Sequence, residues 1–366
     1  MTTKLYRLGL THGDFNGIGY EVLLKTLSDE RMGEIFVPVV YGTKKLLDFY
    51  GKQLDIKLPL PVRTVNAPEE AKPGEISLID ISPEGERYDI TPGTPSEESG
   101  RLAVVALERA RKDLDAGLID GVVTAPIHKD TAHGVLLSDG AEAFPGGHTE
   151  FFGATHPDET PMMVFSDLNG LRVGLMTIHL PLSEVSSAIT REGIINAARR
   201  FERTLRVDFG IRKPRLALLG LNPHAGERGL IGGEDEQILK PAVKDLWETG
   251  MLIFGPYPSD GFWGNSSWIK FDGILAMYHD QGLIPFKMMA MNSGVNITAG
   301  LSVVRTSPDH GTAFDIAGQG VADPGSFRAA IYQVVDILKA RETHAEINAD
   351  PLPIGRRSPE ERRVGV

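Results

Sequence analysis

Three histidines follow apolar, strand-like runs in the middle of the chain. His179 ends the run LRVGLMTIH, His224 follows RLALLGLNP, and His279 follows GILAMY. Residues that follow separate parallel strands meet at one edge of a sheet. Three neutral imidazoles suit Zn²⁺ or a similar divalent ion and leave positions open for a substrate. The alternative is that each is a hydrogen-bonded histidine at a strand end.

A second group of residues is suited to binding an anion. The segment GGHTE offers backbone amides together with His148 and Thr149, and it is typical of a helix start that binds phosphate. Lys287, Asn296 and Arg305 add two cations and an amide. A helix cap and ordinary surface charge are the alternatives, but Arg305 ends an apolar run, where a charge needs a partner.

The run DHGTAFDIAGQG, residues 309–320, is rich in small residues and would let a ligand approach the backbone closely. A structural turn is the alternative. The chain has no P-loop, HExxH or GxSxG motif. Gly17-Ile-Gly19-Tyr-Glu-Val22 is an incomplete dinucleotide fingerprint, so a nicotinamide cofactor would not bind through an ordinary Rossmann site.

Composition excludes several classes of function. The 366 residues include ten His and no Cys, so thiolate chemistry and Cys-ligated metals are excluded. The net charge of −11 argues against nucleic acid or an anionic membrane as a partner. We expect a cytoplasmic protein, because the N-terminus has no signal-like apolar segment and no long apolar run appears.

Short apolar runs alternate with helical patterns, which predicts an α/β fold with a mostly parallel sheet. The expected strands are 5–10, 36–41, 75–81, 118–124, 171–179, 215–221, 273–278 and 295–305. The expected helices are 20–27, 96–116, 183–206, 234–248 with a kink or boundary at Pro241, and 325–340. Residues 345–366 are rich in proline and charge, which favours a solvated or subunit-covering tail.

Taken together, these segments resemble the 4-hydroxythreonine-4-phosphate dehydrogenase family of vitamin B6 biosynthesis. The resemblance runs through GDFNGIGYEV, TAPIHK, GGHTEFF, TIHLPL, LGLNPHAGE, AMYHDQGL and GVNITAGLSVVRTSPDHGTAFDIAG. It implies the isocitrate and isopropylmalate dehydrogenase-like fold, with two α/β domains and a cleft between them, rather than a Rossmann fold. We expect residues 1–125 plus 290–345 on the nucleotide side, 126–289 as the metal, substrate and dimerisation domain, and 346–366 as a tail.

The resemblance also implies a set of site residues. His179, His224 and His279 would hold a divalent metal (Zn, Mg or Co) shared across a homodimer. His148, Thr149, Lys287, Asn296 and Arg305 would contact the substrate, and Lys287, Asp260 and Asp280 would act in catalysis. Lys287 is a candidate proton acceptor or phosphate clamp. NAD or NADP would bind at Asp309, His310, Gly311, Thr312 and Asp315.

The implied reaction is oxidation of 4-phosphooxy-L-threonine at C3, followed by decarboxylation to 3-amino-2-oxopropyl phosphate, with a metal assisting both steps. The N-terminal motif departs from the family pattern at His12, Phe15 and Tyr20. A paralogous D-threonate or D-erythronate 4-phosphate dehydrogenase therefore stays open. Two alternative functions come from other classes: a metal-dependent aldolase or phosphohydrolase, and a binding module without catalysis.

Overall fold

The computed structural model describes residues 4–82, 88–138, 140 and 142–350. Twelve strands in these ranges form one continuous sheet in the order β3-β4-β2-β1-β5-β12-β11-β6-β7-β10-β8-β9. The strands are β1 (Tyr6–Thr11), β2 (Phe36–Gly42), β3 (Val62–Val65), β4 (Ile76–Asp80), β5 (Gly121–Thr124), β6 (Met162–Ser166), β7 (Arg172–Leu175), β8 (Leu216–Leu219), β9 (Ile253–Tyr257), β10 (Gly273–Ala276), β11 (Val295–Ala299) and β12 (Arg305–Pro308).

Most neighbouring strands are parallel. The antiparallel pairs lie together in the middle of the sheet, where β11 pairs with β12 and β6, and β6 pairs with β7. The predicted α/β fold with a mostly parallel sheet is therefore confirmed. The antiparallel strands in the centre also distinguish this sheet from the ordinary Rossmann order.

Helices cover both faces of the sheet. One apolar cluster joins residues of α1, α7, α8 and α11, and two further clusters hold residues of α3 and of α10 on other parts of the sheet. The helices are α1 (Gly19–Leu27), α2 (Lys44–Gln53), α3 (Glu97–Asp115), α4 (Lys129–Ala132), α5 (His148–Gly153), α6 (Leu182–Ala188), α7 (Arg191–Val207), α8 (Lys240–Glu248), α9 (Ser259–Gly264), α10 (His279–Ala290) and α11 (Gly325–Ala349).

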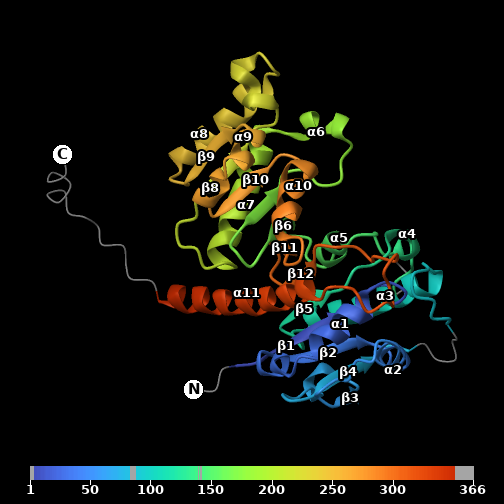
Figure 1. Cartoon of the computed structure of the whole chain (residues 1–366). Coiled ribbons are helices and arrows are strands. Elements are labelled where there is room, and N and C mark those ends of the chain that lie inside the picture. Colours follow the sequence, from blue (N-terminus) through green and yellow to red (C-terminus); the bar gives the residue numbers. More distant parts are fainter. Residues whose placement is uncertain (1–3, 83–87, 139, 141, 351–366) are drawn as a thin grey trace.

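Figure 1 shows two groups of elements, with α1 to α3 around β1 to β4 in one and α7 to α10 around β8 to β10 in the other. Strands β5, β6, β11 and β12 and the helix α11 lie where the groups meet. The domain boundaries given above stay a prediction. None of the helices in the described ranges is long and apolar enough to cross a membrane.

Local sequence explains several helix starts. Ser96 caps α3, because its hydroxyl accepts a hydrogen bond from the Ser99 amide at 3.1 Å and the Ser99 hydroxyl accepts one from the Ser96 amide at 3.3 Å. Thr190 caps α7 in the same way through the Gly193 amide at 3.0 Å. This cap begins a new helix, so the single helix predicted over 183–206 is wrong and α6 and α7 are separate.

Some predicted strands also differ. The strand expected over 171–179 ends at Leu175, and the strand expected over 295–305 is the β11–β12 hairpin. Gly300 has φ +85°, a left-handed conformation that turns the chain between the two strands. Strands β3, β6 and β9 and helices α2 and α10 were not predicted, since their apolar patterns are short or irregular.

The C-terminal half contains two further differences. Pro241 is a boundary, because a π-helical turn, η4 (Asp235–Leu239), precedes it and α8 begins at Lys240. Helix α11 continues to Ala349, so residues 346–349 of the predicted tail are helical. The rest of that tail, 351–366, lies outside the described residues.

Candidate active site

A cavity of about 270 Å³ lies where several strands end. The segment after β5, the loop after β7, the start of α10 after β10, and the end of β12 all contribute to it. Ligands of open α/β sheets bind in such crevices at strand ends. The lining includes the predicted residues His148, Thr149, His179, His279, Lys287, Asn296, Arg305, Asp309, His310 and Gly311.

Arg305 is a buried cation in this cavity, with 2% of its surface exposed. Its guanidinium donates hydrogen bonds to the hydroxyls of Thr124, at 2.6 and 3.1 Å, and Thr298, at 3.2 Å. Burial lowers its pKa to about 9, and the charge of Glu150 opposes that shift. No carboxylate forms an ion pair with Arg305 among the described residues, so the geometry favours an anionic ligand.

Several buried polar atoms of the lining have no hydrogen-bond partner in the described part of the chain. They are His148 Nε2, Thr149 Oγ1, Asn296 Oδ1 and His310 Nε2. Buried polar groups are almost always hydrogen-bonded, so these atoms indicate a polar ligand. Burial, then the charges of Arg305 and Lys129, lower the pKa of His148 well below its ordinary value. His148 is therefore neutral and can both accept and donate a hydrogen bond.

His179 and His279 lie side by side, with ring centroids 6.0 Å apart. Burial first, and then the charge of Lys129, lower the pKa of His179, which favours the neutral, metal-binding ring. His279 Nδ1 lies 2.7 Å from Asp280 Oδ1, an arrangement that leaves Nε2 free for a metal. Asp280 itself does not line the cavity. Two of the three predicted ligands are thus together.

His224 is exposed and lies outside the cavity lining. It begins five consecutive residues, 224–228, whose φ values lie between 42° and 76°. A left-handed conformation costs about 1–2 kcal/mol per non-glycine residue. The buried carboxylate of Asp235 holds the entry to this turn, because it accepts hydrogen bonds from the Leu221 amide at 2.9 Å and the Asn222 amide at 3.1 Å. Nothing in the sequence indicated this role of Asp235.

No group of three metal-ligating side chains forms within the described part of one chain. His179 and His279 fit a divalent ion, and His224 is displayed on the surface by a strained turn. Backbone strain of this kind persists where the surroundings enforce it, often at functional sites. Two of the three predicted ligands therefore lie together in the described chain, and the third is exposed elsewhere.

Lys287 lies on α10 with its Nζ 3.4 Å from Asp309 Oδ1. Asp309 is mostly buried, and burial raises the pKa of its carboxyl while Lys287 opposes the shift. The pair lies at the cavity wall, where an ammonium group can meet a phosphate or accept a proton once deprotonated. Asp260, on α9, is exposed and lies outside the cavity lining.

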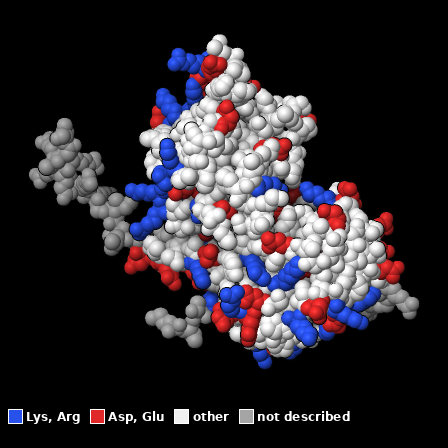
Figure 2. All heavy atoms as spheres, viewed as in Figure 1, with Lys and Arg blue, Asp and Glu red and all other residues white. Residues whose placement is uncertain are grey.

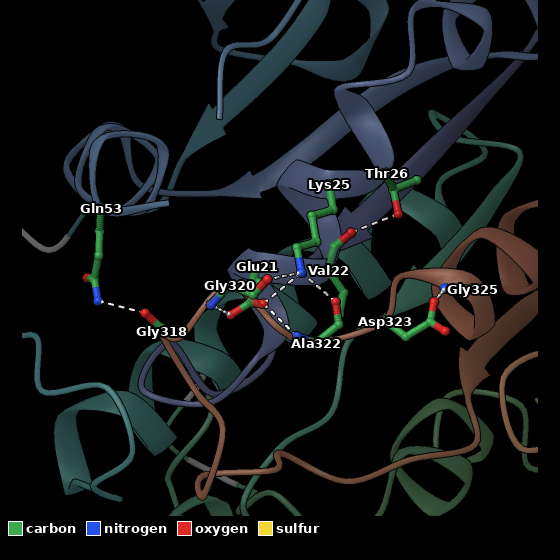
Figure 3. A network of polar contacts seen from close by, with 10 residues as sticks. All are labelled: Glu21, Val22, Lys25, Thr26, Gln53, Gly318, Gly320, Ala322, Asp323 and Gly325. Carbon is green, nitrogen blue, oxygen red and sulfur yellow. Dashed lines mark hydrogen bonds and ion pairs between the residues drawn. The ribbon is translucent and has the colours of Figure 1, made fainter. Parts of the chain in front are cut away.

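The predicted cofactor segment is anchored to α1 (Figure 3). The buried Glu21 accepts hydrogen bonds from the Ala322 amide at 2.7 Å and the Gly320 amide at 3.3 Å. Lys25 lies 2.9 Å from Glu21 and donates to the carbonyls of Gly320 and Ala322 at 2.8 and 2.6 Å. These contacts fix the main chain that follows the segment.

Only part of that segment reaches the cavity. Asp309, His310 and Gly311 line it, whereas Thr312 and Asp315 do not. The Thr312 carbonyl accepts a hydrogen bond from the Ile18 amide at 3.0 Å, which places the segment against the GDFNGIG loop.

Two charged residues of the cavity lining were not among the predicted site residues. Lys129, in the TAPIHK motif, and Glu150, after His148 and Thr149, both line the cavity. The charge of Lys129 lowers the pKa of His179, and the charge of Glu150 raises it. The position of TAPIHK at the end of a predicted strand was the signal that could have identified Lys129.

The N-terminal departures from the family pattern pack together away from the cavity lining. His12 stacks on Tyr20 with ring centroids 4.9 Å apart, and Tyr20 stacks on Tyr50 at 5.5 Å. The Tyr50 hydroxyl donates to the Phe15 carbonyl at 2.5 Å. His12 and Tyr20 therefore belong to an internal aromatic stack, and none of the three departures lines the cavity.

The chain is similar to characterised protein families. Residues 34–334 match the family described as pyridoxal phosphate biosynthetic protein PdxA. A 4-hydroxythreonine-4-phosphate dehydrogenase from Bacteroides thetaiotaomicron is 44% identical over 352 residues, covering 96% of this chain and 94% of the relative. A relative from Cutibacterium acnes, provisionally named a D-threonate 4-phosphate dehydrogenase, is 36% identical over 337 residues, with 91% and 94% covered.

A solved structure shows the same similarity. The 4-hydroxythreonine-4-phosphate dehydrogenase from Klebsiella pneumoniae aligns with a TM-score of 0.75 at 34% identity, covering 92% of this chain and 99% of that one. The mixed α/β fold and these named relatives place the chain among the dehydrogenases. The chain belongs to the PdxA family of pyridoxal phosphate biosynthetic proteins.

Proposed function

We propose that this chain oxidises 4-phosphooxy-L-threonine at C3 with NAD or NADP, and that the product then loses CO₂ to give 3-amino-2-oxopropyl phosphate. The observation that carries the proposal is the buried Arg305, which has no carboxylate partner among the described residues and lies in a cavity lined by buried polar atoms without partners. The names of the relatives support the same substrate. The enzyme would act in the cytoplasm in pyridoxal 5'-phosphate synthesis.

The residues of the chain take distinct roles. Arg305, His148, Thr149 and Asn296 hold and orient the phosphorylated acid. Lys287 faces the same cavity as a phosphate clamp or as the acceptor of the hydroxyl proton. Asp309, His310 and Gly311 would hold a nicotinamide, which would supply the hydride acceptor for C3. A divalent ion (Zn, Mg or Co) held by the three histidines would act as a Lewis acid for oxidation and decarboxylation. Asp260 and Asp280 stay predicted participants.

We further propose that a second copy of the chain completes the metal site. Helix α10 begins at His279 and exposes an apolar stripe beside the cavity, with Ile284, Met288 and Met291 exposed at 58, 82 and 81%. Such exposed apolar surface marks interfaces. Packing of two chains through this face would bring His224 of one chain toward His179 and His279 of the other.

Mixing two inactive variants tests the shared site. His224→Ala and His279→Ala should each lose metal binding and turnover, whereas His344→Ala, a half-buried histidine of α11 outside the active-site lining, should behave as the unsubstituted chain. A mixed dimer of the first two regains one intact site if ligands come from both subunits. Failure of the mixture to regain activity would contradict a shared site, and full activity of His224→Ala without metal would contradict the metal itself.

Turnover rates on different substrates separate the two related activities. We expect turnover of 4-phosphooxy-L-threonine to exceed that of D-threonate 4-phosphate and D-erythronate 4-phosphate. Faster oxidation of either sugar acid would favour the alternative, a D-threonate or D-erythronate 4-phosphate dehydrogenase, which the relative from Cutibacterium acnes keeps open.

A further inference from the structure

A second cavity, of about 490 Å³, lies outside the active site. Helix α7, the segment before β6, the β11–β12 turn and α11 form its walls. It shares no lining residue with the active-site cavity. Its charged residues are Arg200, Arg203, Arg341, Asp158, Glu159 and Asp208.

Two of these side chains, Arg341 and Glu159, already have partners. Arg341 lies 2.7 Å from Asp208 Oδ1 and donates to the Leu301 carbonyl at 3.0 Å. Glu159 accepts a hydrogen bond from the Ser302 amide at 2.8 Å. These contacts fix the cavity wall and leave the other charged side chains to decide what the cavity binds.

Arg200 and Arg203 have no ion pair among the described residues. They lie three residues apart on α7, so they share one face of the helix. The Arg200 Nε is buried and has no hydrogen-bond partner. Burial lowers the pKa of Arg200, and no neighbouring carboxylate compensates. A buried guanidinium donor without a partner points to a missing acceptor.

The surroundings strengthen the positive potential at this edge. An adjacent hollow between the end of α7 and α11 is lined by Arg206, Arg212 and Lys339. Figure 2 shows basic side chains along one edge of the molecule, from the region of α8 down toward α11. In a chain of net charge −11 this local concentration attracts anions.

We propose that the second cavity is a binding site for a small phosphate monoester, held by Arg200 and Arg203. Planar guanidinium forks match phosphate oxygens with paired, charge-assisted hydrogen bonds. Asp158 is an exposed carboxylate of the lining without an ion pair among the described residues, and its charge repels a bound anion.

The site adjoins the strands that carry the active-site residues. Its wall includes Gly300, Leu301 and Ser302 of the turn between β11 and β12, and these strands carry Asn296 and Arg305. An occupant would restrain the turn that Arg341 already holds. None of the lining residues of the second cavity lies on α10, so the cavity differs from the proposed dimer face.

Equilibrium dialysis with inorganic phosphate as the probe tests the proposal on the full chain. Arg203→Gln, an exposed position, should weaken one class of phosphate sites about tenfold, and Arg200→Gln/Arg203→Gln should remove that class. Asp158→Asn should tighten it about twofold, because a repulsive charge is removed. Arg199→Gln, an exposed arginine of α7 outside the cavity lining, should bind phosphate as the unsubstituted chain does.

Turnover in phosphate-free buffer should stay unchanged in all these variants, and phosphate should slow amide exchange over residues 300–304 only when Arg203 is present. Unchanged phosphate binding by Arg203→Gln, or equal weakening by Arg199→Gln, would overturn the proposal. Because the second cavity shares no lining residue with the active site, the phosphate-binding result does not depend on whether the proposed dehydrogenase reaction is correct.

Discussion

Replacement of Arg305 by methionine should stabilise the fold while it removes activity. Burial lowers the Arg305 pKa to about 9, well below its ordinary value, and at about 1.4 kcal/mol per pH unit the buried charge costs about 5 kcal/mol at neutral pH. Thr124 and Thr298 would each lose a hydrogen-bond donor, at about 1 kcal/mol each. Arg305→Met should therefore raise the free energy of unfolding by about 2–3 kcal/mol.

The cost has a defined pH dependence. It is fully present below about pH 9, where the cation is charged in both the folded and unfolded chain, and it fades toward pH 12.5 as the folded state releases its proton. The stabilisation by Arg305→Met should thus be largest at neutral pH, where urea unfolding in phosphate-free buffer can measure it. The same substitution should lower kcat/KM at least about a hundredfold.

Arg341→Met is the matched control with the opposite sign. It leaves the Asp208 carboxylate, 5% exposed, without its partner and should lower the free energy of unfolding by about 1–3 kcal/mol. If Arg305→Met destabilised the chain as much as Arg341→Met does, or kept normal turnover, the assignment of Arg305 as an unpaired cation awaiting an anionic substrate would be refuted.

Three other substitutions test the structure around the site. Glu21→Gln should lower the free energy of unfolding by about 2 kcal/mol and raise the KM for NAD or NADP. The control Lys44→Ala, in an exposed ion pair, should lower it by under about 1 kcal/mol. Equal effects of the two substitutions in urea unfolding would contradict the role of Glu21 in anchoring the predicted cofactor segment. Asp235→Asn should weaken metal binding by His224 about tenfold in chelator competition. Unchanged metal affinity would show that the strained turn has no role in metal binding. His12 has a pKa lowered to about 4 by burial, so stability falls as pH drops from 6.5 to 4 by about 3 kcal/mol. His12→Phe should flatten that part of the stability profile, and an unchanged slope would assign it to other groups.

The repeated order of strands and helices could be predicted from the sequence because apolar runs and helical periods are strong local patterns. The β11–β12 hairpin and the break between α6 and α7 could not, since each depends on a single turn or cap, at Gly300 and Thr190, inside a continuous pattern. Sheet order also stayed undetermined, because the pairing of β6 with β11 joins segments more than a hundred residues apart.

Much of the site could be predicted because its chemistry is carried by rare residue types at strand ends. His148, His179, His279 and Arg305 do meet in one cavity. The exposed position of His224 could not be foreseen, because it depends on a left-handed turn that the remote, buried Asp235 holds. Burial of Arg305 without a carboxylate likewise depends on the positions of Thr124 and Thr298 in neighbouring strands.

The central claim is that this cavity carries out an oxidative decarboxylation of 4-phosphooxy-L-threonine. The most direct test is to incubate the purified protein with that substrate, a divalent ion and NAD or NADP, and to measure the reduced nicotinamide and CO₂ formed. We expect the two products in equal amounts, with both lost in Arg305→Met. Absence of reduced nicotinamide with either cofactor, while the folded protein binds the substrate, would contradict the account.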